Sequence, residues 1–237
     1  DHGIEIDSPV GNVDVHNNVV NATILNGIYI HDATGTAADR ISVTGNTIGN
    51  VTVPFNIGGA GILIEDTALD VHVRSNSVSN TTGIGILVQL GTGTATIANN
   101  ILSDTTLGGI GTAGFATVLI ENNSIVDAAG DAIGVSDATS VAIVGNDIAG
   151  VSPGNGVTAD GGSGAATIVG NDILDVSGTG IDVRDVAGGL YIGVQSGSAA
   201  GNTVNNSGGD GIRVELTANS AGNVSVWYNR MGNSGTI

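Results

Sequence analysis

The sequence predicts an all-β fold in the form of a parallel solenoid, in which one short unit stacks on the next. A two-part frame recurs nine times: a glycine-led apolar pair, G-I-x-V, and a segment V-x-V-x-x-N-x-I around an asparagine. Within each unit apolar residues alternate with polar ones, and a period of two is typical of strands. A repeat of this length indicates a solenoid, because one unit alone cannot bury its apolar side.

Each unit has two anchors that align along the chain. The residues that lead the first part are Gly3, Gly27, Gly61, Gly85, Gly109, Ala132, Gly156, Gly180 and Gly211. The asparagines of the second part are Asn18, Asn46, Asn76, Asn100, Asn123, Asn146, Asn171, Asn202 and Asn229. The step from an asparagine to the next leading residue is 9 residues in six of eight cases, whereas the reverse step varies from 14 to 22. A constant step predicts a turn of fixed geometry, and a variable step predicts a surface loop.

Three strands are expected in each unit, and each has an inward column of mostly β-branched residues, which favour strands. The first strand follows the leading residue, and its column is Ile4, Ile28, Ile62, Ile86, Ile110, Ile133, Val157, Ile181 and Ile212. The second precedes the asparagine, with Val15, Val43, Val73, Ile97, Ile120, Ile143, Ile168, Ala199 and Val226. The third follows it, with Val20, Ile48, Val78, Leu102, Ile125, Ile148, Ile173, Val204 and Met231. At Ala199 we expect an inserted loop, Val194–Ala200, with Leu190 and Ile192 filling the inward positions instead.

These columns predict one domain over residues 1–237, a single right-handed parallel β-helix of about nine coils. At roughly 4.8 Å per coil, the length would be about 43 Å. The asparagine is expected at a sharp bend, because it tolerates the left-handed conformation and its amide can bond the next asparagine in a ladder. The alternatives for such a period are a leucine-rich repeat, although its leucine consensus is absent, and a β-propeller, although the units are short for four-stranded blades.

The segments "RISVTGNTI", "VAIVGNDI" and "ATIVGNDI" closely resemble the parallel β-helix repeat of the pectate-lyase-like superfamily. The resemblance covers the whole chain and is specific for the fold. It is weak for function, since that superfamily includes polysaccharide lyases and hydrolases, phage tailspikes, adhesins and surface-layer proteins.

The amino-acid composition limits the classes of partner that the protein is expected to bind. The chain has 22 acidic residues, five arginines, no lysine and a net charge of −17, so nucleic acid is not expected as a partner. It has no cysteine, and no apolar run approaches the ~18 residues that a membrane span needs. It lacks an initiator methionine and a signal peptide, which indicates a mature form or a fragment. An acidic surface without lysine fits an extracellular or cell-surface location.

Catalytic groups of carbohydrate enzymes with this fold usually lie on an exposed strand face in the middle of the solenoid. Here the central outward positions are small and neutral, which argues against catalysis. The last three coils carry a charge cluster that offers two or three carboxylates and an arginine, enough for a hydrolase pair: Asp160, Asp182, Arg184, Asp210 and Arg213. The alternative is a set of surface ion pairs, with Asp160, Arg184 and Glu215 in one column and Asp182 and Arg213 in the other.

A second cluster in the first three coils is rich in oxygen ligands and can hold Ca²⁺: Asp7, Asp32, Glu65 and Asp66, with His31 beside them. The alternative is a solvated acidic edge. The calcium-binding nonapeptide repeat is absent, and the four histidines do not predict a metal site of their own. No cofactor is required, and Ca²⁺ is the one candidate. Tyr29, Trp227 and Tyr228 are expected to be exposed, where they can stack on sugars.

We expect no end caps, because the chain begins two residues before a leading glycine and stops where the next would follow. Such a chain is either one segment of a longer array or stacks head to tail on other copies. The expected end-to-end interface consists of Ile4, Glu5, Ile6, Asp7, Ile212, Arg213, Val214 and Glu215. The sequence therefore favours a structural protein without enzymatic activity, the body of a filament, sheath, fibre or large adhesin. The alternative is a carbohydrate-active or carbohydrate-binding β-helix.

Overall fold

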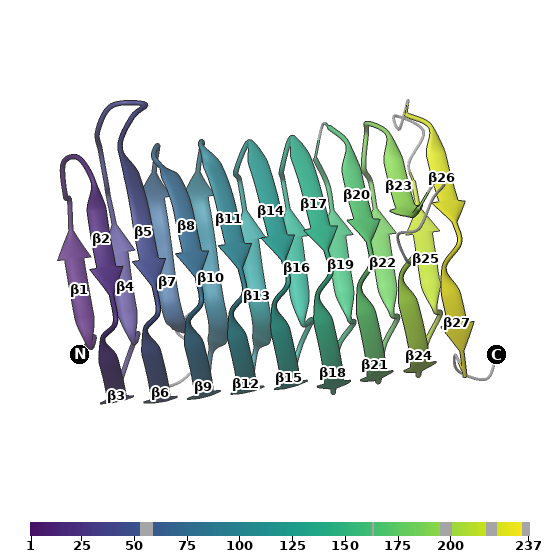
Figure 1. Cartoon of the computed structure of the whole chain (residues 1–237), viewed down its shortest axis with the longest axis horizontal. Coiled ribbons are helices and arrows are strands. Elements are labelled where there is room, and N and C mark those ends of the chain that lie inside the picture. Colours follow the sequence, from purple (N-terminus) through teal and green to yellow (C-terminus); the bar gives the residue numbers. More distant parts are fainter. Residues whose placement is uncertain (53–58, 163, 195–200, 217–221, 234–237) are drawn as a thin grey trace.

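Every coil contributes one short strand to each of three parallel sheets, which run side by side along the molecule (Figure 1). The computed structural model describes residues 1–52, 59–162, 164–194, 201–216 and 222–233. Each sheet has nine strands, and consecutive strands of one sheet come from consecutive coils. The described residues contain no helix. The predicted β-helix of nine coils is confirmed.

The first sheet contains the strands that follow the leading residues. Its strands are β1 (Ile4–Asp7), β4 (Ile28–His31), β7 (Ala60–Thr67), β10 (Ile84–Gly91), β13 (Gly108–Ala113), β16 (Ile133–Ser136), β19 (Val157–Asp160), β22 (Ile181–Arg184) and β25 (Ile212–Glu215). Neighbouring strands pair in the register of the repeat, so that Ile4 lies opposite Ile28 and Ile181 opposite Ile212.

The second sheet precedes the asparagines, and the third follows them. The second contains β2 (Val13–His16), β5 (Arg40–Thr44), β8 (Asp70–Arg74), β11 (Thr94–Ala98), β14 (Thr117–Glu121), β17 (Ser140–Val144), β20 (Ala166–Val169), β23 (Leu190–Gly193) and β26 (Val224–Trp227). The third contains β3 (Val19–Thr23), β6 (Thr47–Val51), β9 (Ser77–Thr81), β12 (Ile101–Thr105), β15 (Ser124–Ala128), β18 (Asp147–Val151), β21 (Asp172–Val176), β24 (Thr203–Ser207) and β27 (Arg230–Gly232).

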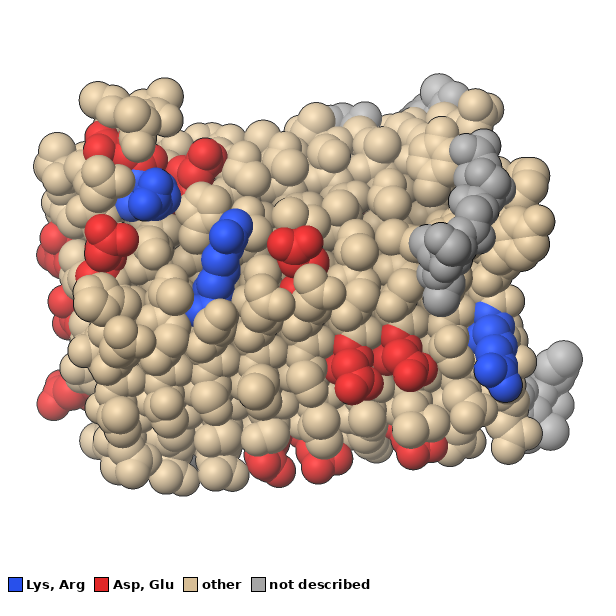
Figure 2. Space-filling model, in the orientation of Figure 1, with Lys and Arg blue, Asp and Glu red and all other residues tan. Residues whose placement is uncertain are grey.

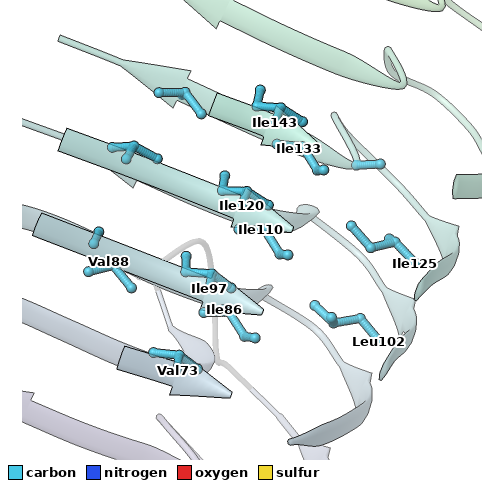
Figure 3. Close-up of a cluster of buried hydrophobic side chains, with 14 of the residues drawn as sticks. Val73, Ile86, Val88, Ile97, Leu102, Ile110, Ile120, Ile125, Ile133 and Ile143 are labelled. Carbon is cyan, nitrogen blue, oxygen red and sulfur yellow. The ribbon is translucent and has the colours of Figure 1, made fainter. Parts of the chain in front are cut away.

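The core lies between the three sheets and is filled by the inward columns. Figure 3 shows the isoleucines of successive coils stacked above one another, with their side chains turned toward the interior. Ile86, Ile97 and Leu102 come from the three strands of one coil, and all three are fully buried. Leu190 and Ile192 fill the inward positions of the eighth coil, as expected, and pair with Ala166 and Ile168. Ala199, for which the inserted loop was predicted, lies outside the described residues.

The nine asparagines form an unbroken ladder at the corner between the second and third sheets. Each side-chain Nδ2 donates to the Oδ1 of the asparagine one coil further on, from Asn18 to Asn46 at 3.0 Å through to Asn202 to Asn229 at 2.8 Å. The backbone N–H of each donor reaches the same oxygen. The ladder stabilises the corner because it supplies hydrogen bonds to buried polar groups that water cannot reach.

The left-handed backbone at this corner falls one residue earlier than the sequence predicts. The ladder asparagines do not have positive φ angles; the residues before them do, for example Asn17 (φ 56°), Asn99 (φ 57°) and Asn122 (φ 53°). The prediction that the ladder residue itself bends the chain is therefore wrong. The recurrence of asparagine at the ladder position reflects the hydrogen bonds of its amide, whereas the bend is made by its neighbour.

The other two corners also contain one left-handed residue in most coils. At the end of the first-sheet strands it is often aspartate, as at Asp32, Asp66, Asp137 and Asp185. In the third sheet it is usually an aspartate or asparagine one residue before the end of the strand, such as Asp104, Asp127 or Asn206. Short Asx side chains tolerate this conformation better than other non-glycine residues. Many aspartates of this acidic chain therefore occupy positions where the backbone adopts the left-handed conformation.

The leading glycines lie where one coil touches the next. At Gly85 an added Cβ would lie 2.5 Å from Cδ2 of Leu102 and 2.8 Å from the carbonyl oxygen of Gly109, both too close for a real contact. Glycine therefore allows the first sheet and the inward column of the third sheet to approach. Ala132 shows that one coil accommodates a methyl group in this column.

Candidate functional site

Three polar side chains gather where the first two strands of the first sheet, β1 and β4, end. Asp7 ends β1, His31 ends β4 in register with it, and Asp32 follows at a left-handed corner. His31 Nδ1 lies 3.6 Å from Asp7 Oδ1 and 3.1 Å from Asp32 Oδ2, and the three potential ligand atoms lie within 4.8 Å of one another. This spacing suits one cation bound between two carboxylates and an imidazole.

The aromatic residue beside this group holds His31 in place. The rings of Tyr29 and His31 are stacked, with centroids 4.4 Å apart, and the ring centroid of His2 lies 4.7 Å from that of Tyr29. The Tyr29 hydroxyl donates to Glu65 Oε1 at 2.6 Å, and Gln89 donates to Glu65 Oε2 at 2.7 Å. Burial raises the pKa of Tyr29, and the hydrogen bond to Glu65 raises it further, so the phenol stays protonated.

The predicted metal cluster is therefore only partly assembled. Asp7 and Asp32 come together, and His31, which was expected beside them, joins them as a third potential ligand. Glu65 is occupied by Tyr29 and Gln89, and Asp66 is an exposed left-handed corner residue outside the group. The outward column of the first sheet runs Asp7, His31, Glu65, Gln89, so His31 stands between two acids and this order is the signal that could have identified it.

The charge cluster of the last coils is centred on Asp182. Its side chain is fully covered, since Arg213 Nε donates to Asp182 Oδ1 at 2.8 Å, Arg213 Nη2 donates to Oδ2, and Arg184 Nη2 donates to Oδ2 at 2.6 Å. Burial alone would raise the pKa of Asp182. The hydrogen bonds and charges of Arg213 and Arg184 outweigh that effect, and the pKa lies below its usual value.

This arrangement corrects the predicted pairing. Asp160, Arg184 and Glu215 do lie in register on β19, β22 and β25, but Arg184 turns toward Asp182 on its own strand. Ion pairing along that column is not found among the described residues. Asp182 has two guanidinium partners and a lowered pKa, so it is unsuited to act as a general acid. Asp160 and Asp210 are exposed and lie outside this cluster.

A shallow hollow of about 250 Å³ lies on the outward face of the central coils, between the two clusters. Its lining includes Leu87, Gly111, Gly134, Thr158 and Asp160. At Gly134 an added Cβ would meet nothing within 4 Å, so the strand itself does not require glycine there. The small neutral residues predicted for this face form the floor of the hollow.

The residues predicted for the end-to-end interface lie on the outermost strands of the first sheet, β1 and β25. Ile4, Ile6, Ile212 and Val214 are partly exposed and pack against the core. Glu5, Asp7 and Glu215 are exposed, whereas Arg213 is bound to Asp182. Trp227 and Tyr228 are exposed at 48% and 72%, as predicted. Tyr29 was predicted to be exposed, which is wrong, because its stacking and its bond to Glu65 cover most of it.

Comparison with known proteins agrees with this architecture. The described part of the chain has no helix long and apolar enough to cross a membrane. No curated protein matches the sequence. The family model described as "Right handed beta helix region" matches residues 85–235, more than half of the chain. The chain thus belongs to the family of right-handed parallel β-helix proteins.

Proposed function

We propose that this protein is an extracellular structural β-helix, the shaft of a filament, sheath, fibre or large adhesin, which lengthens by head-to-tail stacking of copies. The observation that carries the proposal is the directional asparagine ladder. Every step donates from one coil to the next in the same sense, from Asn18 toward Asn229. A further coil beyond β27 would offer the next acceptor, and a coil before β1 the next donor.

The outermost strands support the same direction of assembly. Strands at the edge of a sheet can pair with another chain through their backbone groups. Ile212 and Val214 of one copy would meet Ile4 and Ile6 of the next, which continues the inward columns and removes partly exposed aliphatic surface from water. Such a heterologous contact does not close on itself, so it propagates as a fibre.

Across this joint, one contact between opposite charges and one contact between like charges are expected. Arg213 would lie between Asp182 of its own copy and Glu5 of the next, which favours docking. Glu215 would face Asp7, and two like charges at roughly 5 Å oppose docking. Protonation or a bound cation relieves that repulsion, so stacking should strengthen in mild acid or with a divalent cation.

Sedimentation and electron microscopy at increasing protein concentration test the proposal. The wild-type chain should form linear particles one solenoid wide. Ile6→Asp and Arg213→Glu should each shift assembly to higher protein concentration, because the first buries a charge at the joint and the second places a third acid in the column of Asp182 and Glu5.

Ser136→Asp is the matched control, because it adds a charge to the same sheet in the central coils, away from both ends. It should leave assembly unchanged. A protein that remains monomeric at all concentrations, with and without divalent cations, would contradict self-stacking.

The hollow over the central coils favours a second candidate function, the binding of a polysaccharide along the first sheet. Its apolar wall at Leu87 and acidic wall at Asp160 can contact a sugar ring and its hydroxyls. Gly134→Leu would fill the hollow without meeting protein atoms near Cβ. Binding of polysaccharides on a glycan array that is lost in Gly134→Leu would support this candidate, and no binding by either protein would eliminate it.

A further inference from the structure

A pocket of about 330 Å³ lies on the outward face of the second sheet, over β5 and β8. Its lining residues are Arg40, Ser42, Thr44, His72 and Arg74, which we call the arginine pocket. Two of the five arginines of the chain thus meet in one place. The Asp7–His31–Asp32 group and the Asp182 cluster both belong to the first sheet, so the arginine pocket is separate from them.

The strand register explains how the pocket is built. Ser42 lies opposite His72, Thr44 opposite Arg74, and all point outward from the core. At about 3.3 Å per residue, the Cα atoms of Arg40 and Thr44 are roughly 13 Å apart. The two arginines therefore stand at opposite ends of a floor formed by Ser42 and His72, and their long side chains can reach a ligand between them.

Both guanidinium groups lack the ion pairs expected in so acidic a protein. Among the described residues, neither Arg40 nor Arg74 has a carboxylate oxygen within 4.0 Å. Figure 2 shows how few basic side chains interrupt the face in view, which also carries several acidic ones. In contrast, Arg184 and Arg213 share the buried carboxylate of Asp182.

Asp39, which precedes Arg40 in the sequence, and Asp70, which lies opposite Arg40 on β8, are both engaged elsewhere. Asp39 accepts hydrogen bonds from Thr36 N at 2.8 Å, Thr36 Oγ1 at 2.9 Å and Asn12 Nδ2 at 3.1 Å, which hold the loop before β5. Asp70, opposite Arg40 on β8, accepts from Thr94 N at 2.7 Å. These carboxylates support backbone turns, and the two arginines are left for another anion.

We propose that the arginine pocket binds a single oxyanion group, a sulfate, phosphate or carboxylate, between Arg40 and Arg74. Guanidinium groups present several N–H donors in a planar fork that matches the oxygens of such anions. The hydroxyls of Ser42 and Thr44 supply further donors beneath it, and the imidazole of His72 supplies one more.

The surrounding charges restrict the ligand to a small group. Asp14 on β2, Asp70 on β8 and Glu121 on β14 stand on the same outward face, and the whole chain carries −17. A long polyanion would be repelled beyond the pocket. The ligand is therefore a free oxyanion or one anionic substituent on a sugar.

Calorimetric titration with sodium sulfate at low ionic strength tests the proposal. The wild-type protein should bind one sulfate, and Arg40→Gln and Arg74→Gln should each weaken binding about ten-fold, the effect of losing one charge-assisted hydrogen bond. Arg230→Gln is the matched control, because Arg230 is exposed on the third sheet, and it should bind like the wild type. Equal binding by all four proteins, or the same loss in Arg230→Gln, would overturn the proposal.

A second titration separates the two sources of the anion. Galactose 6-sulfate that binds more tightly than inorganic sulfate identifies a sugar-borne group, whereas equal binding identifies the free anion; both results support the pocket. Galactose that binds as tightly as its sulfate ester overturns it.

The imidazole of His72 provides a readout at the pocket itself. Burial lowers its pKa, the charges of Arg74 and Arg40 lower it further, and only Asp70 acts in the opposite direction. Bound sulfate adds negative charge between the arginines, so the pKa of His72 followed by NMR should rise with sulfate in the wild type, and Arg74→Gln should need about ten-fold more sulfate for its His72 to respond. A His72 pKa that does not respond to saturating sulfate would contradict binding at this place.

Discussion

Asp182 and Arg213 lie opposite each other on β22 and β25, and the guanidinium of Arg213 donates to both carboxylate oxygens, with Nε to Oδ1 at 2.8 Å. Arg184 completes the cover from the same strand as Asp182. One carboxylate thus accepts hydrogen bonds from two arginines of consecutive coils. Asp182, the centre of the charge cluster that suggested a hydrolase pair, is held in an ion triad.

Replacing Asp182 tests this role through the pH dependence of stability. Asp182→Asn should lower the free energy of unfolding at pH 7 by about 1–3 kcal/mol, because two charge-assisted contacts are weakened. The folded-state pKa of Asp182 lies below its ordinary value of 3.8, so its contribution is present above that value and is lost as pH falls through the folded pKa.

Urea unfolding of the wild type and of Asp182→Asn between about pH 7 and pH 2 checks the sign of this pH dependence, because the range extends to both sides of the ordinary aspartate pKa. The difference between wild type and Asp182→Asn should be constant in the upper part of this range and shrink toward the acid end. A difference that grows on acidification would contradict the lowered pKa.

Two adjacent asparagines should differ strongly in how much their substitution destabilises the protein. Asn100 is fully buried; its backbone N–H and Nδ2 both reach Asn123 Oδ1, and its own Oδ1 accepts from Asn76. Asn100→Ala leaves several buried groups without partners and should destabilise the protein by about 3 kcal/mol or more. Asn99 is exposed with φ 57°, so Asn99→Gly should change stability by less than about 0.5 kcal/mol.

Thermal or urea unfolding of the two variants makes the comparison. The pair is well matched, because both changes remove an asparagine from the same corner. Equal losses would show that the ladder amide has no special contribution.

Two glycines of the first sheet should also differ. Gly134→Ala adds a methyl group to open space on the outward face and should stabilise the protein by about 0.5–1 kcal/mol through reduced freedom of the unfolded chain. Gly85→Ala forces a methyl group against Leu102 and the carbonyl of Gly109, and should cost about 1–3 kcal/mol. Melting temperatures that change in the same direction would contradict this assignment of the two positions.

A divalent cation should bind the Asp7–His31–Asp32 group. We propose Zn²⁺ before Ca²⁺, because an imidazole nitrogen is a ligand that Zn²⁺ accepts and Ca²⁺ does not favour. Adding Zn²⁺ to chelator-treated protein should raise the melting temperature, since a ligand of the folded state stabilises it by mass action.

Two substitutions distinguish this site from general binding to an acidic surface. His31→Gln should abolish the rise in melting temperature, whereas Asp66→Asn should preserve it, because Asp66 lies outside the group. A rise of equal size in His31→Gln, or no rise with either cation, would exclude the site.

The sequence predicts the fold because each inward column repeats in all coils, so the stacking of Ile86, Ile110 and Ile133 follows from the spacing of the repeat alone. The position of the bend is less predictable, since Asn99 and Asn100 have the same side chain but differ in backbone conformation, burial and hydrogen bonding. The identity of a residue alone does not show whether it adopts the left-handed conformation at the bend or makes the hydrogen bonds of the ladder.

The sites are harder to predict because they depend on where long side chains turn. Register places Arg184 beside Asp160 and Glu215, but the side chain reaches Asp182 instead. The arginine pocket does have a sequence signal: counting two and four residues back from Asn46 and Asn76 aligns Thr44 with Arg74 and Ser42 with His72. This signal lies in the outward columns of the second sheet, and the outward columns of the first sheet do not contain it.

In the part of the chain that the structure describes, the strands of each sheet pair only with those of the preceding and following coils, which makes the molecule a one-dimensional array. Opening can therefore start at a terminal coil and travel inward one coil at a time. Amide protons of β13, β14 and β15 should exchange with solvent last and those of the outermost coils first. In a shaft of joined copies every coil becomes an interior coil, so elongation itself would slow fraying and hinder proteolysis without any change in the sequence of the repeat.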